Sequence, residues 1–220
     1  MSEPKRELKG TGFGGQHYTI AVSGSASGVC DECGYTKAYD VGKEIAQHNC
    51  VLLNGATTGV PHYAAIGANE NGGFCIGFSP AISKKVHVKK YALPLDGLNF
   101  VIYTGFNYSG RNLLLTRAAD AVVVVCGRIG TLNEFTSAFE DGKLIGVLLH
   151  SGGITDEIPH IIEVARRGRG RVVYSADPKD LINQIVANLK EDDHINFKTN
   201  SKQLHGNDVD LKVLKCVSRA

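Results

Sequence analysis

The chain has 220 residues and a mass of 23.6 kDa, long for one compact domain and short for two, so we expect one core with a loose tail. Apolar residues make up 43% and charged residues 21%, a globular composition that excludes disorder over most of the chain. The net charge of +2 predicts no nucleic-acid partner. No apolar run is long enough for a secretory signal or a membrane span, so we expect no membrane partner and a cytoplasmic location.

Short apolar, β-branched segments alternate along the chain with segments of helical periodicity. In chain order, we expect strand Tyr18–Val22, helix Tyr35–His48, strand Val51–Leu53, helix Pro61–Asn71, strand Cys75–Gly77, strand Leu98–Tyr103, helix Gly110–Ala119, strand Ala121–Val125, helix Leu132–Asp141, strand Leu144–Leu149, helix Glu157–Arg167, strand Arg171–Tyr174 and helix Pro178–Leu189. The strands rarely alternate in polarity, as is typical of parallel strands covered on both faces. This order predicts an α/β fold with a doubly wound, mostly parallel Rossmann-like sheet and helices on both faces.

Three segments differ from this pattern. Residues 1–16 form a polar N-terminal segment, and residues 191–220 form a C-terminal tail rich in lysine, aspartate and asparagine. Between them, residues 17–190 form the expected Rossmann-like nucleotide-binding domain. Residues 79–97 are rich in lysine with two prolines, and we expect an irregular excursion there.

Six cysteines are scattered through the chain, and without a signal peptide we expect reduced thiols. Cys50, Cys75 and Cys126 lie in or beside apolar runs and are interpreted as small buried side chains. Only Cys30 and Cys33 have the spacing of metal ligands or of a redox dithiol, and we favour two ordinary loop thiols over either role. A zinc site would need a second such pair, so we expect no metal.

Small residues follow three of the expected strands. The turns are Ser23–Gly28, Asn54–Gly59 and Cys126–Thr131. Because ligands of doubly wound sheets bind at the carboxyl ends of strands, and a helix start there presents free N–H groups, these turns predict a phosphate site. The predicted phosphate-binding residues are Gly24, Ser25, Gly55, Thr58, Gly127, Arg128, Gly130 and Thr131.

No turn has the glycine-lysine order of an ATP-hydrolysing P-loop or the glycine spacing of an NAD site, so we expect no such cofactor. The polar candidates beside the turns are Arg111, Asn112, Arg117 and Glu134, of which we single out Arg111 and Glu134. Glu134 follows Thr131 by three residues, so a capping-box carboxylate is its structural alternative. For Arg111 the alternative is a solvated helix face.

The central region resembles the superfamily of lonely-guy cytokinin-activating enzymes, also called lysine-decarboxylase-like, which includes molybdenum-cofactor carrier proteins. The family pattern is an Arg-Lys pair, an Ala-Asp-Ala strand entry, then Pro-Gly-Gly-x-Gly-Thr-x-x-Glu. Here Arg111-Asn112, Ala119–Ala121 and Cys126–Glu134 occupy those places with the family's spacing. The resemblance covers roughly residues 18–189 and implies a homodimer.

In the family's hydrolases the turn binds the 5′-phosphate of a nucleoside monophosphate, and the arginine and glutamate catalyse cleavage of the bond between the base and ribose. The resemblance therefore assigns these catalytic roles to Arg111 and Glu134. A carboxylate near the sugar would stabilise the positive charge that develops during such cleavage. The chain departs from the pattern at Cys126, Arg128 and Asn112, which stand for proline, glycine and lysine. If the turn required a positive φ at Arg128, that residue would carry roughly 1–2 kcal/mol of strain.

Two main hypotheses follow for the function. The first is a phosphoribohydrolase acting on nucleoside 5′-monophosphates. The second is a non-catalytic binder or carrier of a small phosphorylated ligand, such as a nucleotide or a pterin cofactor containing molybdenum. A DNA-binding module of the same fold is a weaker third hypothesis, since the charge is near neutral.

Overall fold

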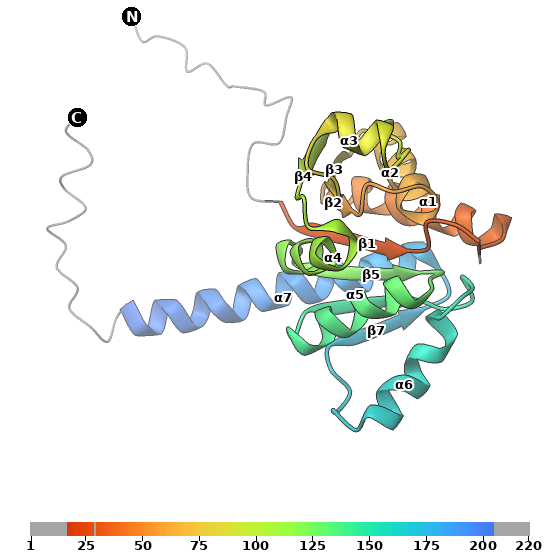
Figure 1. Ribbon diagram of the computed structural model, residues 1–220. Coiled ribbons are helices and arrows are strands. Elements are labelled where there is room, and N and C mark those ends of the chain that lie inside the picture. Colours follow the sequence, from red (N-terminus) through yellow and green to blue (C-terminus); the bar gives the residue numbers. More distant parts are fainter. Residues whose placement is uncertain (1–16, 29, 205–220) are drawn as a thin grey trace, which may run out of the picture.

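The computed structural model describes residues 17–28 and 30–204, with side chains as far as Ile195. Its seven strands form one parallel sheet in the order β4-β3-β2-β1-β5-β6-β7. The strands are β1 (Thr19–Gly24), β2 (Val51–Asn54), β3 (Phe74–Ser79), β4 (Phe100–Tyr103), β5 (Ala121–Val125), β6 (Leu144–Leu148) and β7 (Val172–Ser175). The chain fills one half of the sheet from β1 outward to β4 and then returns to the other side of β1 with β5. The predicted doubly wound Rossmann-like fold is confirmed (Figure 1).

Helices cover both faces of the sheet. They are α1 (Glu32–Gln47), α2 (Val60–Glu70), α3 (Lys84–Lys89), α4 (Asn107–Ala118), α5 (Ile129–Glu140), α6 (Ile158–Ala165) and α7 (Pro178–Leu204), with a 3₁₀ turn at Thr155–Glu157. One apolar core joins the sheet to α1, α2 and α7, and the second joins it to α4, α5 and α6. In Figure 1, α4 and α5 lie in front of the sheet and α7 crosses behind it.

Two interior strands, β5 and β6, show why the apolar runs did not alternate. Every residue of β5 and of β6 is buried, since each strand faces helices on both sides. Each of these side chains leaves water, and a fully buried valine or leucine contributes roughly 1.5–3 kcal/mol. Helices α1 and α2 pack so closely that a Cβ at Gly42 would lie 1.9 Å from the carbonyl oxygen of Ala64.

The segment expected to be an irregular excursion contains a short helix, α3, which periodicity missed because six residues are less than two turns. Ser83 caps it by accepting a hydrogen bond from the Val86 amide. His87 is fully buried and lies between the Ser79 hydroxyl, 2.8 Å from Nδ1, and the Pro94 carbonyl oxygen, 3.0 Å from Nε2. These two contacts hold the excursion against the end of β3.

Helix α7 begins where the sequence predicted, with Asp177 accepting from the Asp180 amide just before Pro178. It continues to Leu204, past the predicted end at Leu189. Its buried stripe nevertheless stops at Leu189, so the continuation does not pack on the core through the side chains described there. The boundaries at residues 17 and 190 stay predictions, and residues 1–16 lie outside the described part. Among the described residues, no helix combines the length and apolar character needed to cross a membrane.

Candidate functional site

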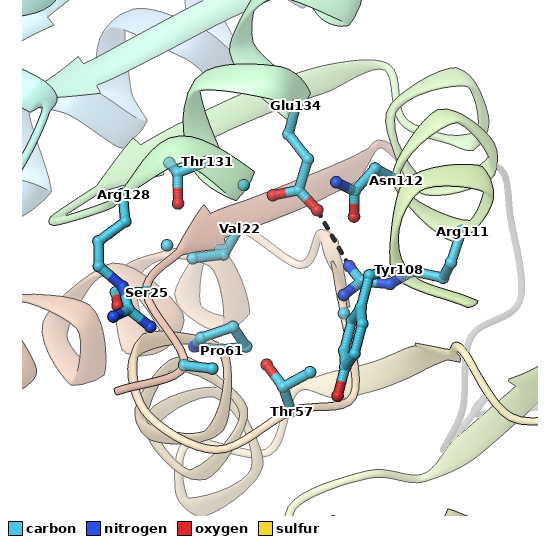
Figure 2. A pocket seen from close by; sticks show the side chains of 14 residues that line it. Val22, Ser25, Thr57, Pro61, Tyr108, Arg111, Asn112, Arg128, Thr131 and Glu134 are labelled. Atoms are coloured by element: carbon cyan, nitrogen blue, oxygen red, sulfur yellow. Dashed lines mark hydrogen bonds and ion pairs between the residues drawn. The ribbon is translucent and has the colours of Figure 1, made fainter. Parts of the chain in front are cut away.

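A cavity of about 180 Å³ opens at the carboxyl ends of β1 and β5, where the strand order reverses. It is lined by Val22, Gly24, Ser25, Ala26, Gly55, Thr57, Pro61, Tyr108, Arg111, Asn112, Arg128, Gly130, Thr131 and Glu134. Residues from all three glycine-containing turns therefore meet here, together with two helices, α4 and α5 (Figure 2). Open α/β sheets place ligands at this reversal because the loops on either side of it diverge.

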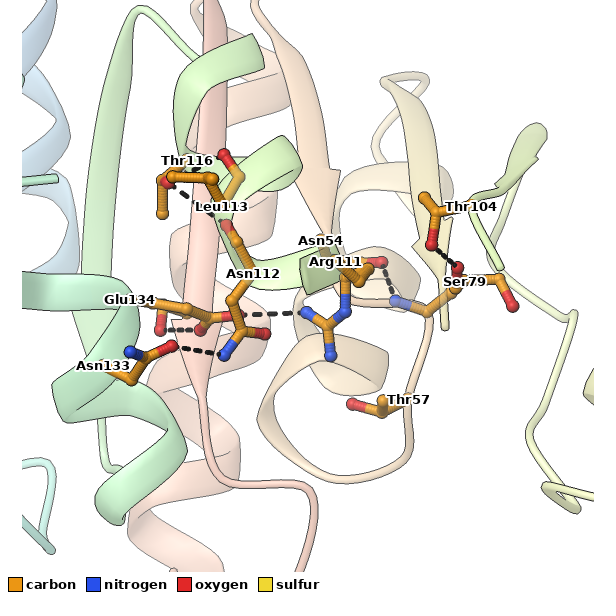
Figure 3. Close-up of polar contacts among 12 residues, drawn as sticks. Asn54, Thr57, Ser79, Thr104, Arg111, Asn112, Leu113, Thr116, Asn133 and Glu134 are labelled. Atoms are coloured by element: carbon orange, nitrogen blue, oxygen red, sulfur yellow. Dashed lines mark hydrogen bonds and ion pairs between the residues drawn. The ribbon is translucent and has the colours of Figure 1, made fainter. Parts of the chain in front are cut away.

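An ion pair forms one wall of the cavity. Arg111 Nη1 lies 3.0 Å from Glu134 Oε1, and the two residues are only 5% and 6% exposed. Ser23, at the end of β1, donates from its hydroxyl to the other carboxylate oxygen of Glu134. The Glu134 side chain thus turns away from the helix start and does not form the capping box considered from the sequence. Figure 3 shows Arg111 and Asn112 converging on it from α4.

Asn112 occupies the place of the family's lysine and extends this network. Its amide nitrogen lies 3.0 Å from Asn133 Oδ1. In the opposite amide orientation, the nitrogen donates to Tyr108 O and Glu134 Oε1, both at 2.9 Å. That orientation satisfies more of the buried polar groups around Glu134, which folded proteins rarely leave unpaired.

The same burial perturbs both charged groups. It raises the pKa of Glu134 above its usual value, while Arg111 and the Ser23 hydroxyl oppose the shift. It lowers the pKa of Arg111, opposed by the charge of Glu134, although a guanidinium remains protonated in proteins. Arg111 Nε is buried and has no hydrogen-bond partner. Perturbed ionisable groups beside a cavity are typical of functional sites.

Gly55, one of the predicted phosphate-binding residues, also packs directly against the side chain of Arg111. A Cβ at this position would lie 2.2 Å from Arg111 Nη1. The absence of a side chain in the second turn therefore leaves room for the guanidinium beside Glu134. The same turn also lines the cavity directly, through Gly55 and Thr57.

The third turn leads directly into α5. Arg128 is the N-cap residue, and no side chain caps the helix start. Its backbone is extended, with φ −121°, so the strain predicted for a non-glycine residue there is absent. The positive φ falls two residues earlier, on Cys126 at 25°. The turn can therefore accommodate an arginine in place of the family's glycine.

The guanidinium of Arg128 reaches across the mouth of the cavity to the first turn. Its Nη2 lies 3.5 Å from the Ser27 hydroxyl, and Figure 2 shows the side chain beside Ser25. No carboxylate is paired with it among the described ion pairs. A Cβ built on Gly130 would meet nothing within 4 Å, so the start of α5 is open towards the cavity.

Eight of the ten residues predicted for the site line this cavity. The two others support it from outside. Thr58 is exposed and donates to the Ala26 carbonyl oxygen at 2.9 Å, which ties the second turn to the first. Gly127 bridges to Gly153, and its carbonyl oxygen accepts from the Ile154 amide. The roles predicted for all ten residues stay proposals.

Sequence reasoning missed three polar side chains of the site, Ser23, Thr57 and Tyr108, and three small or apolar residues that line the cavity, Val22, Ala26 and Pro61. Ser23 and Thr57 lie within the turns that the sequence singled out, but the predicted ligand-binding role was assigned to other residues of those turns. Tyr108 is half exposed in the first turn of α4 and lines the cavity near Arg111. The sequence did contain a signal for Tyr108, because it precedes Arg111 by three positions and so lies on the same face of α4.

The expectation of six reduced thiols is wrong for two of them. Cys30 and Cys126 form a disulfide, with Cα atoms 5.9 Å apart and a separation of 96 positions in sequence. The prediction rested on the absence of a signal peptide, and it could not foresee that the β1–β5 pairing brings two distant loops together. Cys50 and Cys75 are buried thiols as expected, and Cys33 is exposed. Among the described residues, no group of three or more histidine, cysteine or acidic side chains could hold a metal.

Comparison with known proteins agrees with this architecture. An uncharacterised protein of Archaeoglobus fulgidus is 34% identical over 129 residues, which span 59% of this chain and 78% of that protein. The molybdenum cofactor carrier protein of Chlamydomonas reinhardtii superposes with a TM-score of 0.66 at 26% identity, over 80% of this chain and 99% of the other. The molybdenum cofactor binding protein of Rippkaea orientalis has a TM-score of 0.65 at 24% identity, over 78% and 97%.

A more distant structure is DNA processing protein A of Helicobacter pylori, described as binding single-stranded DNA. It has a TM-score of 0.57 at 17% identity, over 78% of this chain and 81% of that one. At this level the likeness shows a shared fold alone. The model of the SLOG cluster4 family, LDcluster4, matches residues 17–182, which confirms the resemblance found in the turns. The chain belongs to the SLOG cluster4 family.

Proposed function

We propose that this protein binds a small phosphorylated ligand, of nucleotide or pterin type, and carries it without cleaving it. The observation that carries the proposal is the uncapped start of α5 beside Arg128, open to the cavity at Gly130. Free N–H groups and the positive end of the helix dipole favour an anion there. Arg128 adds a cation with no carboxylate partner among the described ion pairs.

The size of the cavity supports the same assignment. Its volume of about 180 Å³ is below the roughly 300–1,000 Å³ typical of sites that enclose drug-sized ligands. The cavity therefore has room for the phosphate end of a ligand, and the rest would extend past Tyr108 and Thr57 towards solvent. Tyr108 is 48% exposed and offers a ring face to a flat heterocycle.

The hydrogen bonds of the Glu134 carboxylate favour a carrier over a hydrolase. Both of its carboxylate oxygens already accept hydrogen bonds, one from Arg111 and the other from Ser23. These two donors hold the carboxylate in place, and the positive charge of Arg111 partly offsets the negative charge that would stabilise a positively charged sugar. The likeness to the molybdenum cofactor carrier protein of Chlamydomonas reinhardtii, two structures of which align at 26% and 28% identity, points in the same direction.

The second candidate is hydrolysis of nucleoside 5′-monophosphates. The placement of Arg111 and Glu134 in the cavity wall, 3.0 Å apart, favours it because the family's hydrolases use this pair. A ligand that displaced Ser23 would leave one carboxylate oxygen free for the sugar. The two candidates thus share the phosphate site and differ in whether turnover follows binding.

One experiment separates them. The full chain is mixed with AMP, GMP, inorganic phosphate or isolated molybdenum cofactor, and melting temperature and free base are recorded together. A carrier shows a ligand-dependent rise in melting temperature and no base, and at 100 times Kd the stabilisation is about 2.7 kcal/mol. Base release that Glu134→Gln abolishes would establish the hydrolase instead. No stabilisation by any of these compounds would refute the phosphate site.

Arg128→Ala serves as the binding control, since it removes the cation without touching the core. It should weaken phosphate-dependent stabilisation and leave the ligand-free melting temperature unchanged. Lys179→Ala, at an exposed position in the first turn of α7, is the matched control for charge.

A homodimer is also part of this proposal. Light scattering at several concentrations should give twice the 23.6 kDa chain mass.

A further inference from the structure

Two of the three turns that line the cavity are joined covalently. Cys30 lies in the loop that follows β1, just before Asp31 caps α1, and Cys126 is the first residue after β5. Ser25 and Ala26 from the first loop and Arg128 and Gly130 from the second line the cavity. The disulfide therefore ties together the two sides of the proposed phosphate site.

Backbone contacts concentrate at the same point. The carbonyl oxygen of Cys126 accepts from the Ser25 amide at 2.8 Å, and its amide donates to the Ser151 hydroxyl at 2.9 Å. Cys126 is fully buried and has a positive φ of 25°. The position of this one residue thus determines how the first loop lies relative to the start of α5.

A third sulfur lies within one helical turn of the disulfide. Cys33 is the second residue of α1, three places after Cys30, and its thiol is free and exposed. Cys30 packs against the same turn, since a Cβ at Gly34 would be 3.3 Å from Cys30 Cβ. The Cys-x-x-Cys spacing allows a disulfide within the loop as an alternative to the one across the cavity.

The other described thiols are unsuited to exchange. Burial raises the pKa of Cys50 to about 11, and it raises that of Cys75 further still. Both lie beneath helices in the core that contains α1 and α2. Because the thiolate is the attacking species, neither contributes at neutral pH. Cys30, Cys33 and Cys126 are thus the reactive set among the cysteines described.

We propose that these three cysteines form a thiol–disulfide exchange site that controls the ligand cavity. The Cys33 thiolate attacks Cys30 Sγ, the Cys30–Cys126 bond breaks, and the bonding electrons leave with Cys126, which takes up a proton. A Cys30–Cys33 disulfide forms, with no net oxidation. A small dithiol then attacks the exposed Cys33 sulfur, becomes a cyclic disulfide itself and leaves both protein thiols reduced.

The consequence for the cavity rests on the proposed function. With Cys126 linked to Cys30, the first loop is held in place before a ligand arrives. Breaking the link frees this loop, and ordering it again on binding costs free energy. We expect phosphate-type ligands to bind the cross-linked form more tightly, by several-fold up to about tenfold, than the form in which Cys126 is a thiol.

The exchange is tested without any ligand. The full chain is equilibrated with graded ratios of reduced and oxidised dithiothreitol, free thiols are alkylated, and disulfides are mapped by mass spectrometry. Oxidising mixtures should give Cys30–Cys126 with Cys33 alkylated, and partial reduction should give Cys30–Cys33 with Cys126 alkylated. Cys33→Ser should keep the first disulfide and slow its reduction at least tenfold, whereas Cys50→Ala, which removes a buried thiol, should leave both maps unchanged.

Two results would overturn the exchange site. One is a Cys126 that is alkylated under every condition or linked to a cysteine other than Cys30. The other is a Cys33→Ser variant whose disulfide is reduced at the wild-type rate. AMP and inorganic phosphate are then titrated into both redox forms. Equal affinities would refute the control of the cavity, while no binding to either form would refute the proposed function and leave the exchange site standing.

Discussion

Replacing Glu134 by glutamine tests whether the buried ion pair is a structural centre of the site. The change keeps the shape of the side chain and removes its charge, so the Arg111 guanidinium stays buried without a counter-charge. The side chains of the pair are 7% and 8% exposed, and Arg111 Nε has no hydrogen-bond partner. The guanidinium also cannot swing towards the second turn, because it already fills the space beside Gly55.

Removing one partner of a buried pair costs about 3–5 kcal/mol, and the structure offers Arg111 no substitute. We therefore expect Glu134→Gln to lower the free energy of unfolding by an amount in this range. Urea denaturation at pH 7.5 measures it as a shift of the midpoint at constant slope. The double variant Arg111→Met with Glu134→Gln should lose less than the sum of the two single changes, by about 1–3 kcal/mol.

The matched control is Glu140→Gln, which breaks the ion pair with Arg167 on the exposed side of the same helix, α5. Water screens that pair, so the denaturation midpoint should stay at the wild-type value. A Glu134→Gln variant that also unfolds at the wild-type midpoint would refute the reasoning. It would mean that water entering the cavity already solvates Arg111, so that the pair contributes little.

Four further outcomes are expected. Gly130→Asp should abolish binding of inorganic phosphate in calorimetry without shifting the melting temperature, because its Cβ meets no atom within 4 Å. Gly42→Ala should lower the melting temperature, since its Cβ would lie 1.9 Å from a backbone oxygen of α2. Cys126→Ser should lower the unfolding free energy by up to about 4–5 kcal/mol, the chain-entropy estimate for a loop near 100 residues. The folded-state pKa of Cys50, raised by burial from 9.0 to about 11, predicts that stability is lost as pH rises through this range, because the unfolded chain releases the proton first. Urea midpoints at pH 8.5 and 10.5 check this, and Cys50→Ala should flatten the dependence.

The architecture could be predicted because its signals are local. The strand Ala121–Val125 was found from five consecutive apolar residues, and its bounds agree with β5. The turns were found for the same reason, since small residues between a strand and a helix determine the backbone there whatever lies beyond them. α3 was missed because six residues supply too little periodicity, and its stability depends on the contacts of a buried histidine with distant groups.

The site was predicted as a set of residues, but its contacts were not. Arg111 and Glu134 were named from a family spacing, yet their mutual pairing and the part played by Ser23, 111 residues before Glu134, were not foreseen. Strain at Arg128 was a conditional expectation, because a sequence motif does not say which residue of a turn has a positive φ. The positive φ falls on Cys126.

The sequence by itself therefore determined the fold class, the strand-end turns and most of the side chains that line the cavity. Tertiary structure alone decided which of these side chains touch. It placed Cys126 beside Cys30 across 96 residues, and it placed Ser23 beside Glu134. The physical reason is the parallel pairing of β1 with β5, which sets two turns edge to edge at the reversal of strand order. Local propensity carries no information about which strands pair. The pairing depends on how the helices cover the two apolar faces of the whole sheet.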